Sequence, residues 1–435
     1  MSKKYRIITL GCKVNQCETA SIQERFASKD YQPTENSADA DFIIINTCIV
    51  TRRASSQSRQ AIRKAIKENS CAKIAVVGCY PQVFPEELKK IEGIDVLLGN
   101  SDKGRIVDIL TRPEGSYSLK KTGSSHENKP FDILPAKRFM DRTKAFLKVQ
   151  DGCDSFCTYC IVPYARGPVK SMKPDDVLRS IAAYTDEGYR EIVLTGIHLG
   201  KYGKGPAEKS QLVPLLKMIA KQGTCARIRL SSLEPGEISD ELIEMAASEP
   251  WLCSHFHIPL QSGDAKILKS MNRHYTPHEY KNLVHRIHRA IPDAAIGADI
   301  ITGFPGEDDT AFNNSYSLID DSPVSYLHVF PFSPRKGTPA AGFKGQVDAG
   351  VIRERARRLR ELGKNKKGLF YRSFIGKEIT VLAEGWDPEQ DRTVKGLTDN
   401  YLKVTMHSNE QVKNRFIRVT AERLHRDCLV GKITA

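Results

Sequence analysis

The sequence predicts an α/β fold in three parts: an N-terminal parallel α/β sheet domain, a central partial barrel of six strands with helices, and a small all-β barrel at the C-terminus. Two observations predict this fold class. Short apolar runs alternate with amphipathic stretches as far as residue 332, a pattern typical of parallel strands covered by helices. Beyond residue 374 the runs are short and separated by turn residues, which indicates a small β-barrel.

The composition of the 435-residue chain is that of a globular protein, with 40% hydrophobic and 27% charged residues. No apolar run approaches the ~20 residues of a membrane helix, so no membrane association is predicted. The N-terminal segment Met1–Tyr5 is not followed by an apolar stretch of the kind found in export signals. The 11 cysteines are an odd number, which favours a reducing cytoplasm with metal-binding or catalytic thiols over disulfides.

The positive charge is concentrated at the C-terminal end of the chain. The formal net charge is +14, and residues 351–435 hold 19 Lys and Arg against 11 Asp and Glu, so this last fifth supplies +8. A basic excess of this kind indicates a polyanionic partner, most often nucleic acid. General solubility is the alternative, but the asymmetry along the chain favours an RNA-binding appendage.

In the N-terminal part, residues 1–112, a cysteine follows each of three predicted strands. The predicted strands are Tyr5–Leu10, Phe42–Thr47 and Ile74–Gly78, and the helices between and after them are Glu18–Ser28, Arg53–Glu68 and Pro85–Ile91. The cysteines are Cys12, Cys48 and Cys79. Because the carboxyl ends of parallel strands share one edge of a sheet, these thiols are expected to converge there. Three thiolates suit an iron–sulfur cluster or zinc, and the alternative is three small buried side chains.

Three further cysteines lie within eight residues, in the segment Cys153-Asp-Ser-Phe-Cys157-Thr-Tyr-Cys160. This spacing brings three thiolates together whatever the surrounding fold. A structural zinc ion usually takes four protein ligands, and His126 and His198 are too distant in sequence to complete a local finger. A [4Fe-4S] cluster held by three thiolates keeps one iron open to another ligand, so a cluster is the favoured interpretation.

The central part, residues 139–350, is predicted to contain six strands. They are Ala145–Gln150, Glu191–Gly196, Arg227–Ser232, His255–Leu260, Ala295–Gly303 and Ser325–Phe330. The predicted helices are Pro174–Glu187, Gln211–Gln222, Ser239–Ser248, Pro277–Ile291 and Asp309–Asp320. Six strands fall short of the eight that close a complete barrel, so an open barrel is expected. Polar residues stand at the strand ends, where α/β barrels place their active sites.

Changes in composition mark the remaining boundaries. Residues 113–138 are rich in Pro, Gly, Ser and Lys and are predicted to link the N-terminal part to the central part. Residues 351–370 are predicted to form a basic amphipathic helix. Residues 371–435 are predicted to form the β-barrel from the strands Glu378–Glu384, Thr393–Leu397, Tyr401–Met406 and Phe416–Thr420.

Two segments resemble the methylthiotransferase family of the radical S-adenosylmethionine (SAM) superfamily. They are GCKVNQCE at Gly11–Glu18 and LKVQDGCDSFCTYCIVPYARG at Leu147–Gly167, and the resemblance extends over essentially the whole chain. It implies two [4Fe-4S] clusters, the auxiliary one on Cys12, Cys48 and Cys79 and the radical-SAM one on Cys153, Cys157 and Cys160. It also implies that the C-terminal barrel is a TRAM domain, which holds tRNA in family members.

The resemblance also implies SAM contacts at the mouth of the barrel. The expected cofactor-binding residues are Tyr159, Gly196, His198, Glu234, Asp299 and Ile301. The region Gly196–His198 is expected to meet the SAM amino group, Glu234 the ribose or methionine end, and Ile301 the adenine. Outside this set, Arg166 and Arg273 are candidate partners for a carboxylate or phosphate.

The implied activity is insertion of a methylthio group at C2 of N6-threonylcarbamoyladenosine at position 37 of tRNA. That carbon has neither an acidic proton nor a leaving group, so radical chemistry must supply the reactivity. One SAM would donate the methyl group and a second would yield the radical. The implied partners are the tRNA anticodon stem-loop and an electron donor such as a flavodoxin or ferredoxin, and the enzyme is expected to be a monomer.

Three alternatives stay open. The motif GCKVNQ resembles the threonylcarbamoyladenosine branch, but sister branches act on isopentenyladenosine in tRNA and on an aspartate of a ribosomal protein. A metal-containing RNA-binding protein without radical chemistry is the non-enzymatic alternative. Such a protein would hold two metal sites and would not cleave SAM.

Overall fold

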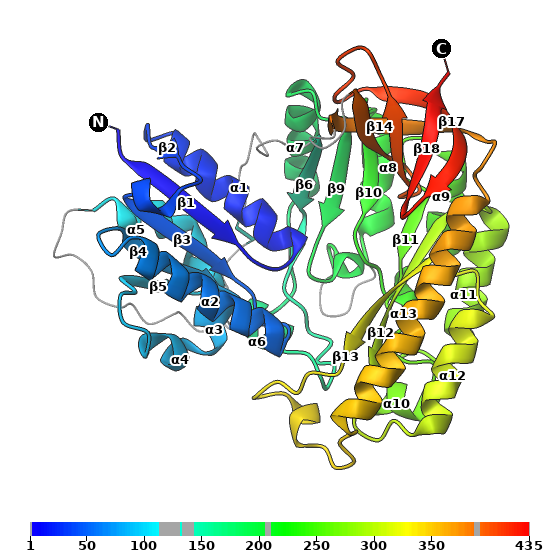
Figure 1. The fold of residues 1–435 in the computed structure, drawn as a ribbon, viewed down its shortest axis with the longest axis horizontal. Coiled ribbons are helices and arrows are strands. Elements are labelled where there is room, and N and C mark those ends of the chain that lie inside the picture. The colour runs from blue at the N-terminus through cyan, green and yellow to red at the C-terminus, as the bar shows by residue number, and fades with distance from the viewer. Residues whose placement is uncertain (1, 113–130, 133–142, 205–209, 387–391, 435) are drawn as a thin grey trace.

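A computed structural model describes residues 2–112, 131–132, 143–204, 210–386 and 392–434, in which three groups of strands follow one another along the chain (Figure 1). These groups are a parallel N-terminal sheet, six central strands and a closed C-terminal barrel, so the predicted α/β fold class is confirmed. Nearly all of the predicted linker 113–138 lies outside the described residues.

The N-terminal sheet has five parallel strands in the order β2-β1-β3-β4-β5. Their bounds are β1 Lys4–Thr9, β2 Gln32–Pro33, β3 Phe42–Thr47, β4 Lys73–Gly78 and β5 Val96–Leu98. The three predicted strands are confirmed as β1, β3 and β4. The sequence did not predict β2 and β5, because strands of two and three residues are too short to give a recognisable apolar run.

Helices cover both faces of this sheet. They are α1 Lys13–Ala27, α2 Arg52–Glu68, α3 Cys79–Val83, α4 Pro85–Lys89 and α5 Ile106–Leu110. On one face Ile43 and Ile45 share a core with Ile62 of α2. On the other face Ile44 shares a core with Phe26 of α1. Alternate residues of β3 therefore enter opposite cores, which explains why the strand is a continuous apolar run.

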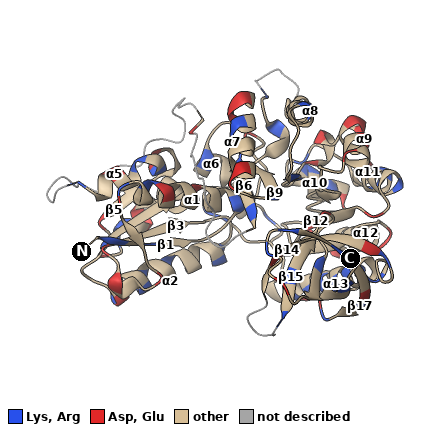
Figure 2. Ribbon diagram, turned by 90° about the horizontal axis from the view of Figure 1, so that it is seen from above, with Lys and Arg blue, Asp and Glu red and all other residues tan. Residues whose placement is uncertain are grey.

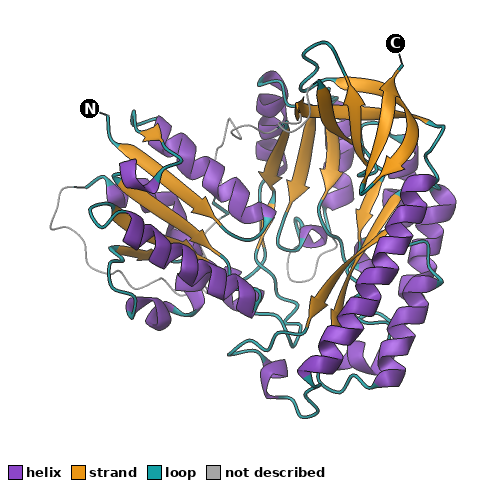
Figure 3. Ribbon diagram, in the orientation of Figure 1, coloured by secondary structure: helices purple, strands orange, loops and turns teal. Residues whose placement is uncertain are grey.

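The central part has six strands in chain order. They are β6 Lys144–Lys148, β9 Glu191–Thr195, β10 Arg227–Leu230, β11 His255–His257, β12 Ala295–Thr302 and β13 Tyr326–Pro331. The first three form one parallel sheet and the last three another, with a β-bridge from Ile228 to Leu252 between them. Within the described ranges no pairing joins β6 to β13, so the predicted open barrel of six strands is confirmed (Figure 3).

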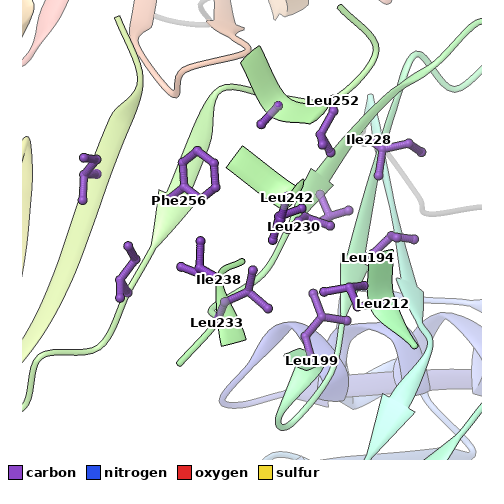
Figure 4. Close-up of a cluster of buried hydrophobic side chains, with 14 of the residues drawn as sticks. Leu194, Leu199, Leu212, Ile228, Leu230, Leu233, Ile238, Leu242, Leu252 and Phe256 are labelled. Carbon is purple, nitrogen blue, oxygen red and sulfur yellow. The ribbon is translucent and has the colours of Figure 1, made fainter. Parts of the chain in front are cut away.

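Five predicted helices of the central part are confirmed, and they bury the outer face of the strands. They are α7 Pro174–Asp186, α8 Leu212–Gln222, α9 Asp240–Ser248, α11 Pro277–Ala290 and α12 Asp309–Asp320. Figure 4 shows part of the shared core, where Leu194 and Leu230 of the strands lie among Leu212 of α8 and Leu242 of α9. Burial of this apolar surface is the main stabilising contribution, and it holds the strand ends that carry the polar residues.

The C-terminal part is a closed barrel of five strands in the order β14-β15-β16-β18-β17. Their bounds are β14 Glu378–Trp386, β15 Thr393–Thr398, β16 Lys403–His407, β17 Phe416–His425 and β18 Cys428–Ile433. Four of these strands were predicted and β18 was not. The turn before it, Arg426 and Asp427, contains neither Gly nor Pro, and Arg426 itself takes the positive φ of +52°. Neither Gly nor Pro therefore marked this turn in the sequence.

Helix α13, Ala349–Arg372, leads from the central strands to this barrel and packs against β13, where Gly363 lies beside Leu327. It confirms the predicted basic helix. Figure 2 shows its Lys and Arg residues together with those of the neighbouring barrel. Among the described helices, none is both long enough and apolar enough to cross a membrane.

Two buried arginines of β10 dock the C-terminal barrel on the central strands. Arg227 donates to the carbonyl of Leu397 at 2.8 Å, and Arg229 donates to the carbonyl of Thr398 at 3.0 Å. Both guanidinium groups also pair with the buried carboxylate of Glu191. Because the charges are compensated on both sides, this contact fixes the barrel next to the open side of the central part.

Candidate active site

Cys12, Cys48 and Cys79, here called the N-terminal triad, lie at the carboxyl edge of the N-terminal sheet. Cys12 precedes α1, Cys48 follows β3, and Cys79 begins α3 directly after β4. Burial is the largest cause that raises the pKa of Cys48, and the neighbouring Cys79 and Cys12 thiols also raise it, to about 11 in all. The thiols thus lie close enough to influence one another, and the expected convergence is present.

Two glycines allow this convergence. Gly11 and Gly78 precede Cys12 and Cys79, with φ of +101° and +105°, a region that glycine adopts readily. A Cβ on Gly11 would stand 2.7 Å from the Cβ of Cys48. Only glycine therefore lets the segment before α1 approach the segment after β3.

Cys153, Cys157 and Cys160, here called the central triad, lie on one loop at the carboxyl end of β6. The loop runs from β7 (Gln150–Asp151) to α6 (Val162–Arg166). Its backbone is pinned at both ends, since the N–H of Cys153 donates to the carbonyl of Gly167 at 3.0 Å and the N–H of Cys160 donates to that of Cys157 at 2.9 Å. The central triad is therefore held by local backbone contacts.

His198 attaches the central triad to the barrel. Its Nδ1 lies 3.4 Å from the Sγ of Cys153, and its Nε2 lies 2.5 Å from the Oε1 of Glu237. Burial opposes a proton on this ring, but Cys153 and Glu237 outweigh burial and raise the pKa of His198 to about 9. In return, His198 outweighs burial and lowers the pKa of Cys153. This contact favours a thiolate, the form that binds iron.

Gly196 lies two residues before His198 and close to the same glutamine. The Oε1 of Gln150 accepts from the N–H of His198 at 2.7 Å, and a Cβ on Gly196 would stand 2.7 Å from that oxygen. A side chain at 196 would push the glutamine away. Glycine is therefore needed at this strand end for the backbone of residues 196–198 to stay at the mouth of the barrel.

Glu234 and Arg273 form an ion pair on the other side of the central triad. The guanidinium of Arg273 donates to both carboxylate oxygens of Glu234, and its Nη1 lies 3.5 Å from the Sγ of Cys157. The Arg273 side chain is 6% exposed. The carboxylate partner expected for Arg273 is therefore present in the chain itself.

The remaining expected cofactor contacts divide between two places. Tyr159 and Ile301 pack against one small apolar core, and the ring of Tyr159 lies 6.5 Å from that of Phe304. Asp299 is not part of this core. Its Oδ1 is bonded to His257 and His328 on the strands to either side.

Each triad adjoins the contact between the N-terminal sheet and the loop before α6. The Nδ2 of Asn100 lies 3.5 Å from the Sγ of Cys79 and donates to the carbonyl of Ala165 at 2.7 Å. Ala165 belongs to α6, five residues after Cys160, and it shares a core with Cys79. Helices α3 and α6 accordingly lie side by side (Figure 1).

A buried group of charges crosses the junction between the N-terminal sheet and the barrel. Glu18 of α1 accepts from the Nη1 of Arg166 at 2.5 Å and also pairs with Lys103 and Lys148. Although burial opposes the carboxylate charge, Arg166 and Lys103 hold the pKa of Glu18 well below its usual range. Arg166, like Arg273, therefore has a carboxylate partner in the chain itself.

The three thiols of each triad are a donor set suited to an iron–sulfur cluster. Within the described ranges, the only three His, Cys, Asp or Glu ligand atoms that lie within 4.8 Å of one another belong to His257, Asp299 and His328. A zinc ion with Zn–S bonds of about 2.3 Å holds its sulfurs within about 4.6 Å of one another. Neither triad is that compact, whereas a [4Fe-4S] cluster distributes its thiolates over separate irons.

Comparison with known proteins identifies the family of this chain. The model of uncharacterized protein family UPF0004 matches residues 4–99, and that of the Radical SAM superfamily matches residues 147–319. The chain is 36% identical to threonylcarbamoyladenosine tRNA methylthiotransferase MtaB of Bacillus subtilis (strain 168), over 94% of this chain and 92% of that protein. The chain belongs to the radical-SAM methylthiotransferase family. It is therefore an enzyme, a transferase, and the non-enzymatic alternative is excluded.

A second relative of this methylthiotransferase is tRNA-2-methylthio-N(6)-dimethylallyladenosine synthase of Fusobacterium nucleatum, with 35% identity over 99% of this chain and 100% of that protein. Among solved structures, the radical S-adenosylmethionine methyltransferase TsrM from Kitasatospora setae has a TM-score of 0.57 at 12% identity, covering 78% of this chain and 77% of that one. At this identity the likeness concerns the fold alone.

Two contacts of the site were not predicted from the sequence. Glu237 holds His198, and its only sequence signal is its place three residues after Glu234, which the structure shows to be a capping box around Pro235. Asn100 joins Cys79 to Ala165 of α6 but follows the three-residue strand β5, so nothing in the sequence marked its position.

Proposed function

We propose that this methylthiotransferase acts on tRNA and inserts a methylthio group at C2 of N6-threonylcarbamoyladenosine at position 37, using two [4Fe-4S] clusters and two molecules of SAM. The observation that carries the proposal is that Cys79 shares a buried core with Ile161, the residue after Cys160, so that each triad adjoins the contact between α3 and α6. A reaction that needs both a sulfur donor and a radical requires two such sites side by side. Relatives named for threonylcarbamoyladenosine support this substrate.

Each triad would hold one cluster through three thiolates. When bound, the central cluster supplies the electron that cleaves SAM to a 5′-deoxyadenosyl radical, and the N-terminal cluster carries the sulfur to be methylated. The chain's own groups hold and tune the thiolates. His198 contacts the sulfur of Cys153 and Arg273 that of Cys157, and hydrogen bonds to cluster sulfurs shift reduction potentials.

The SAM contacts in this proposal follow the shape of the barrel mouth. The backbone of Gly196–His198 would meet the amino group, because Gln150 holds it there. Glu234 would bind the ribose or methionine end, with its orientation fixed by Arg273. Tyr159 and Ile301 would border the adenine, since both lie on one apolar surface. Asp299 lies two residues before Ile301 and is already engaged by two histidines.

The C-terminal barrel and α13 would hold the anticodon stem-loop. Basic residues along α13 include Arg357 and Lys364, and the barrel docks through Arg227 and Arg229 beside the open side of the central strands. Lys and Arg on such a surface bind phosphates without reading sequence. The target base could then enter the open side of the central barrel.

The enzyme would act in a reducing cytoplasm, which suits 11 cysteines that are all free thiols. A flavodoxin or ferredoxin would deliver the electron to the central triad, and the enzyme would act as a monomer. A second candidate substrate is N6-dimethylallyladenosine, because a relative named for that product is 35% identical over 99% of the chain.

Mass spectrometry of tRNA nucleosides tests the substrate. A bacterial strain without its own tRNA methylthiotransferases would receive the wild-type gene or a Cys153→Ala variant. We expect 2-methylthio-N6-threonylcarbamoyladenosine only with the wild-type gene. Appearance of the methylthiolated dimethylallyl nucleoside instead would select the second candidate. If neither methylthiolated nucleoside appears in either strain, the proposal is contradicted.

A further inference from the structure

A separate group of ligand-type side chains lies on the inner face of the barrel, away from the cysteines. It consists of His257 at the end of β11, Asp299 in β12 and His328 in β13, here called the histidine–aspartate group. β12 lies between the other two strands, and Asp299 is in register with His328. The alternate residues Ala298 and Ile300 are buried in the core under the helices, so Asp299 faces the inside of the barrel.

The three donor atoms are spaced like ligands of one ion. The Nε2 of His257 lies 2.8 Å from the Oδ1 of Asp299, and the Nδ1 of His328 lies 3.2 Å from the same oxygen. All three atoms lie within 4.8 Å of one another. Bonds of about 2.0–2.2 Å from one ion to adjacent ligands place the donor atoms roughly 3 Å apart. An ion therefore fits without any movement of the strands.

The second ring nitrogen of His257 also has a partner. Its Nδ1 lies 3.1 Å from the hydroxyl of Tyr326, which in turn lies 2.8 Å from the Nε2 of His255. A metal-bound histidine usually donates its other N–H to such a group, which fixes the ring in the binding orientation. Gly297 makes room for this contact, because a Cβ there would stand 2.2 Å from the ring of Tyr326.

The histidine–aspartate group also has space on its open side. The side chain of His328 is 54% exposed, whereas those of Asp299 and His257 are 21% and 10% exposed. A cavity of about 240 Å³ reaches Tyr326 and His328 from between α13 and the C-terminal barrel, where Tyr401 lines it. Of the three ligand side chains, only that of His328 lines this cavity, so an ion would have open coordination positions on the His328 side.

We propose that the histidine–aspartate group binds a divalent transition-metal ion. Two imidazoles and one carboxylate form a ligand set suited to ions such as Fe²⁺, Zn²⁺ and Mn²⁺, and the carboxylate supplies a compensating negative charge. The open positions would take water or an oxygen atom of a bound substrate. This site goes beyond the proposed function, because methylthiolation as proposed assigns no metal ion to these three side chains.

Binding of Mn²⁺ to the full-length, cluster-reconstituted protein tests the site, with the free ion counted by its electron paramagnetic resonance signal. Mn²⁺ prefers nitrogen and oxygen ligands, so it does not compete for the cysteines. We expect one bound Mn²⁺ per chain for the wild type and none for His257→Ala or Asp299→Asn. Tyr326→Phe removes only the supporting hydroxyl and should weaken binding about tenfold.

His288→Ala is the matched control, because His288 is an exposed histidine on the outer side of α11. It should bind Mn²⁺ like the wild type. The iron content of the same samples reports whether the fold and the triads are intact, so this test does not depend on methylthiolation. Absence of bound Mn²⁺ in the wild type, or equal binding by the wild type and both ligand variants, would overturn the proposal.

Discussion

Each of the two cysteine triads offers three thiols, but the chain brings these thiols together in two different ways. The N-terminal triad gathers residues 67 positions apart, and it depends on three strand ends and on Gly11 and Gly78. The central triad spans eight residues of one loop and depends on local backbone contacts and on His198. A site assembled by the whole sheet should be sensitive to changes of the fold, whereas the loop site should be sensitive mainly to changes at its own ligands.

The largest effect is expected from Cys157→Ala. Loss of one thiolate from the central triad should remove its cluster and with it all cleavage of SAM, so both 5′-deoxyadenosine and methylthiolated product should fall to background. The measurement is chromatography of 5′-deoxyadenosine after anaerobic reconstitution and reduction with dithionite. Cleavage of SAM at the wild-type rate would show that the central triad is not the radical site.

Cys12→Ala should separate the two triads. It removes a thiolate from the N-terminal triad only, so SAM should still be cleaved while no methylthio product forms. Both quantities can be measured in one reaction with tRNA. Cys71→Ala, at an exposed cysteine in the turn before β4, is the control and should keep both SAM cleavage and product formation. Product formation by Cys12→Ala would refute the assignment of the auxiliary cluster.

Glu18→Gln tests the buried charges between the triads. The change leaves Lys103 buried without its carboxylate and leaves Arg166 and Lys148 with Asp151 alone. Removal of one partner from a buried ion pair costs about 3–5 kcal/mol of unfolding free energy. Urea unfolding of the apo-protein measures it. Glu354→Gln, in an exposed pair with Arg357 on α13, should leave the midpoint nearly unchanged. Equal unfolding midpoints for the two variants would mean that the buried charges do not stabilise the junction between the N-terminal sheet and the barrel.

A smaller effect is expected from Gly78→Ala. The φ of +105° is unfavourable for alanine, and the added Cβ would stand 2.9 Å from the side-chain oxygen of Asn46. We expect a cost of about 1–3 kcal/mol and a loss of iron from the N-terminal triad alone. Gly342→Ala, where a Cβ meets open space, is the control. Wild-type iron content in Gly78→Ala would show that the triad tolerates a shift of this strand end.

The sequence predicted the features that repeat or that lie close together. Apolar runs such as Phe42–Thr47 marked the sheet, and the spacing of the central triad marked a cluster site by itself. It could not predict pairings between distant polar side chains, such as Arg166 with Glu18, because nothing local distinguishes a buried partner from a surface charge. Asp299 was expected to contact SAM, but its two histidine partners depend on the register of β11, β12 and β13.

The central claim is that the two triads hold separate clusters at one junction. Iron and sulfide analysis with Mössbauer spectroscopy of the reconstituted protein tests it most directly, on the wild type and on variants in which all three cysteines of one triad are replaced by alanine. We predict two [4Fe-4S] clusters in the wild type and one in each triple variant. One cluster in the wild type, or unchanged iron after replacement of Cys12, Cys48 and Cys79, would contradict the claim.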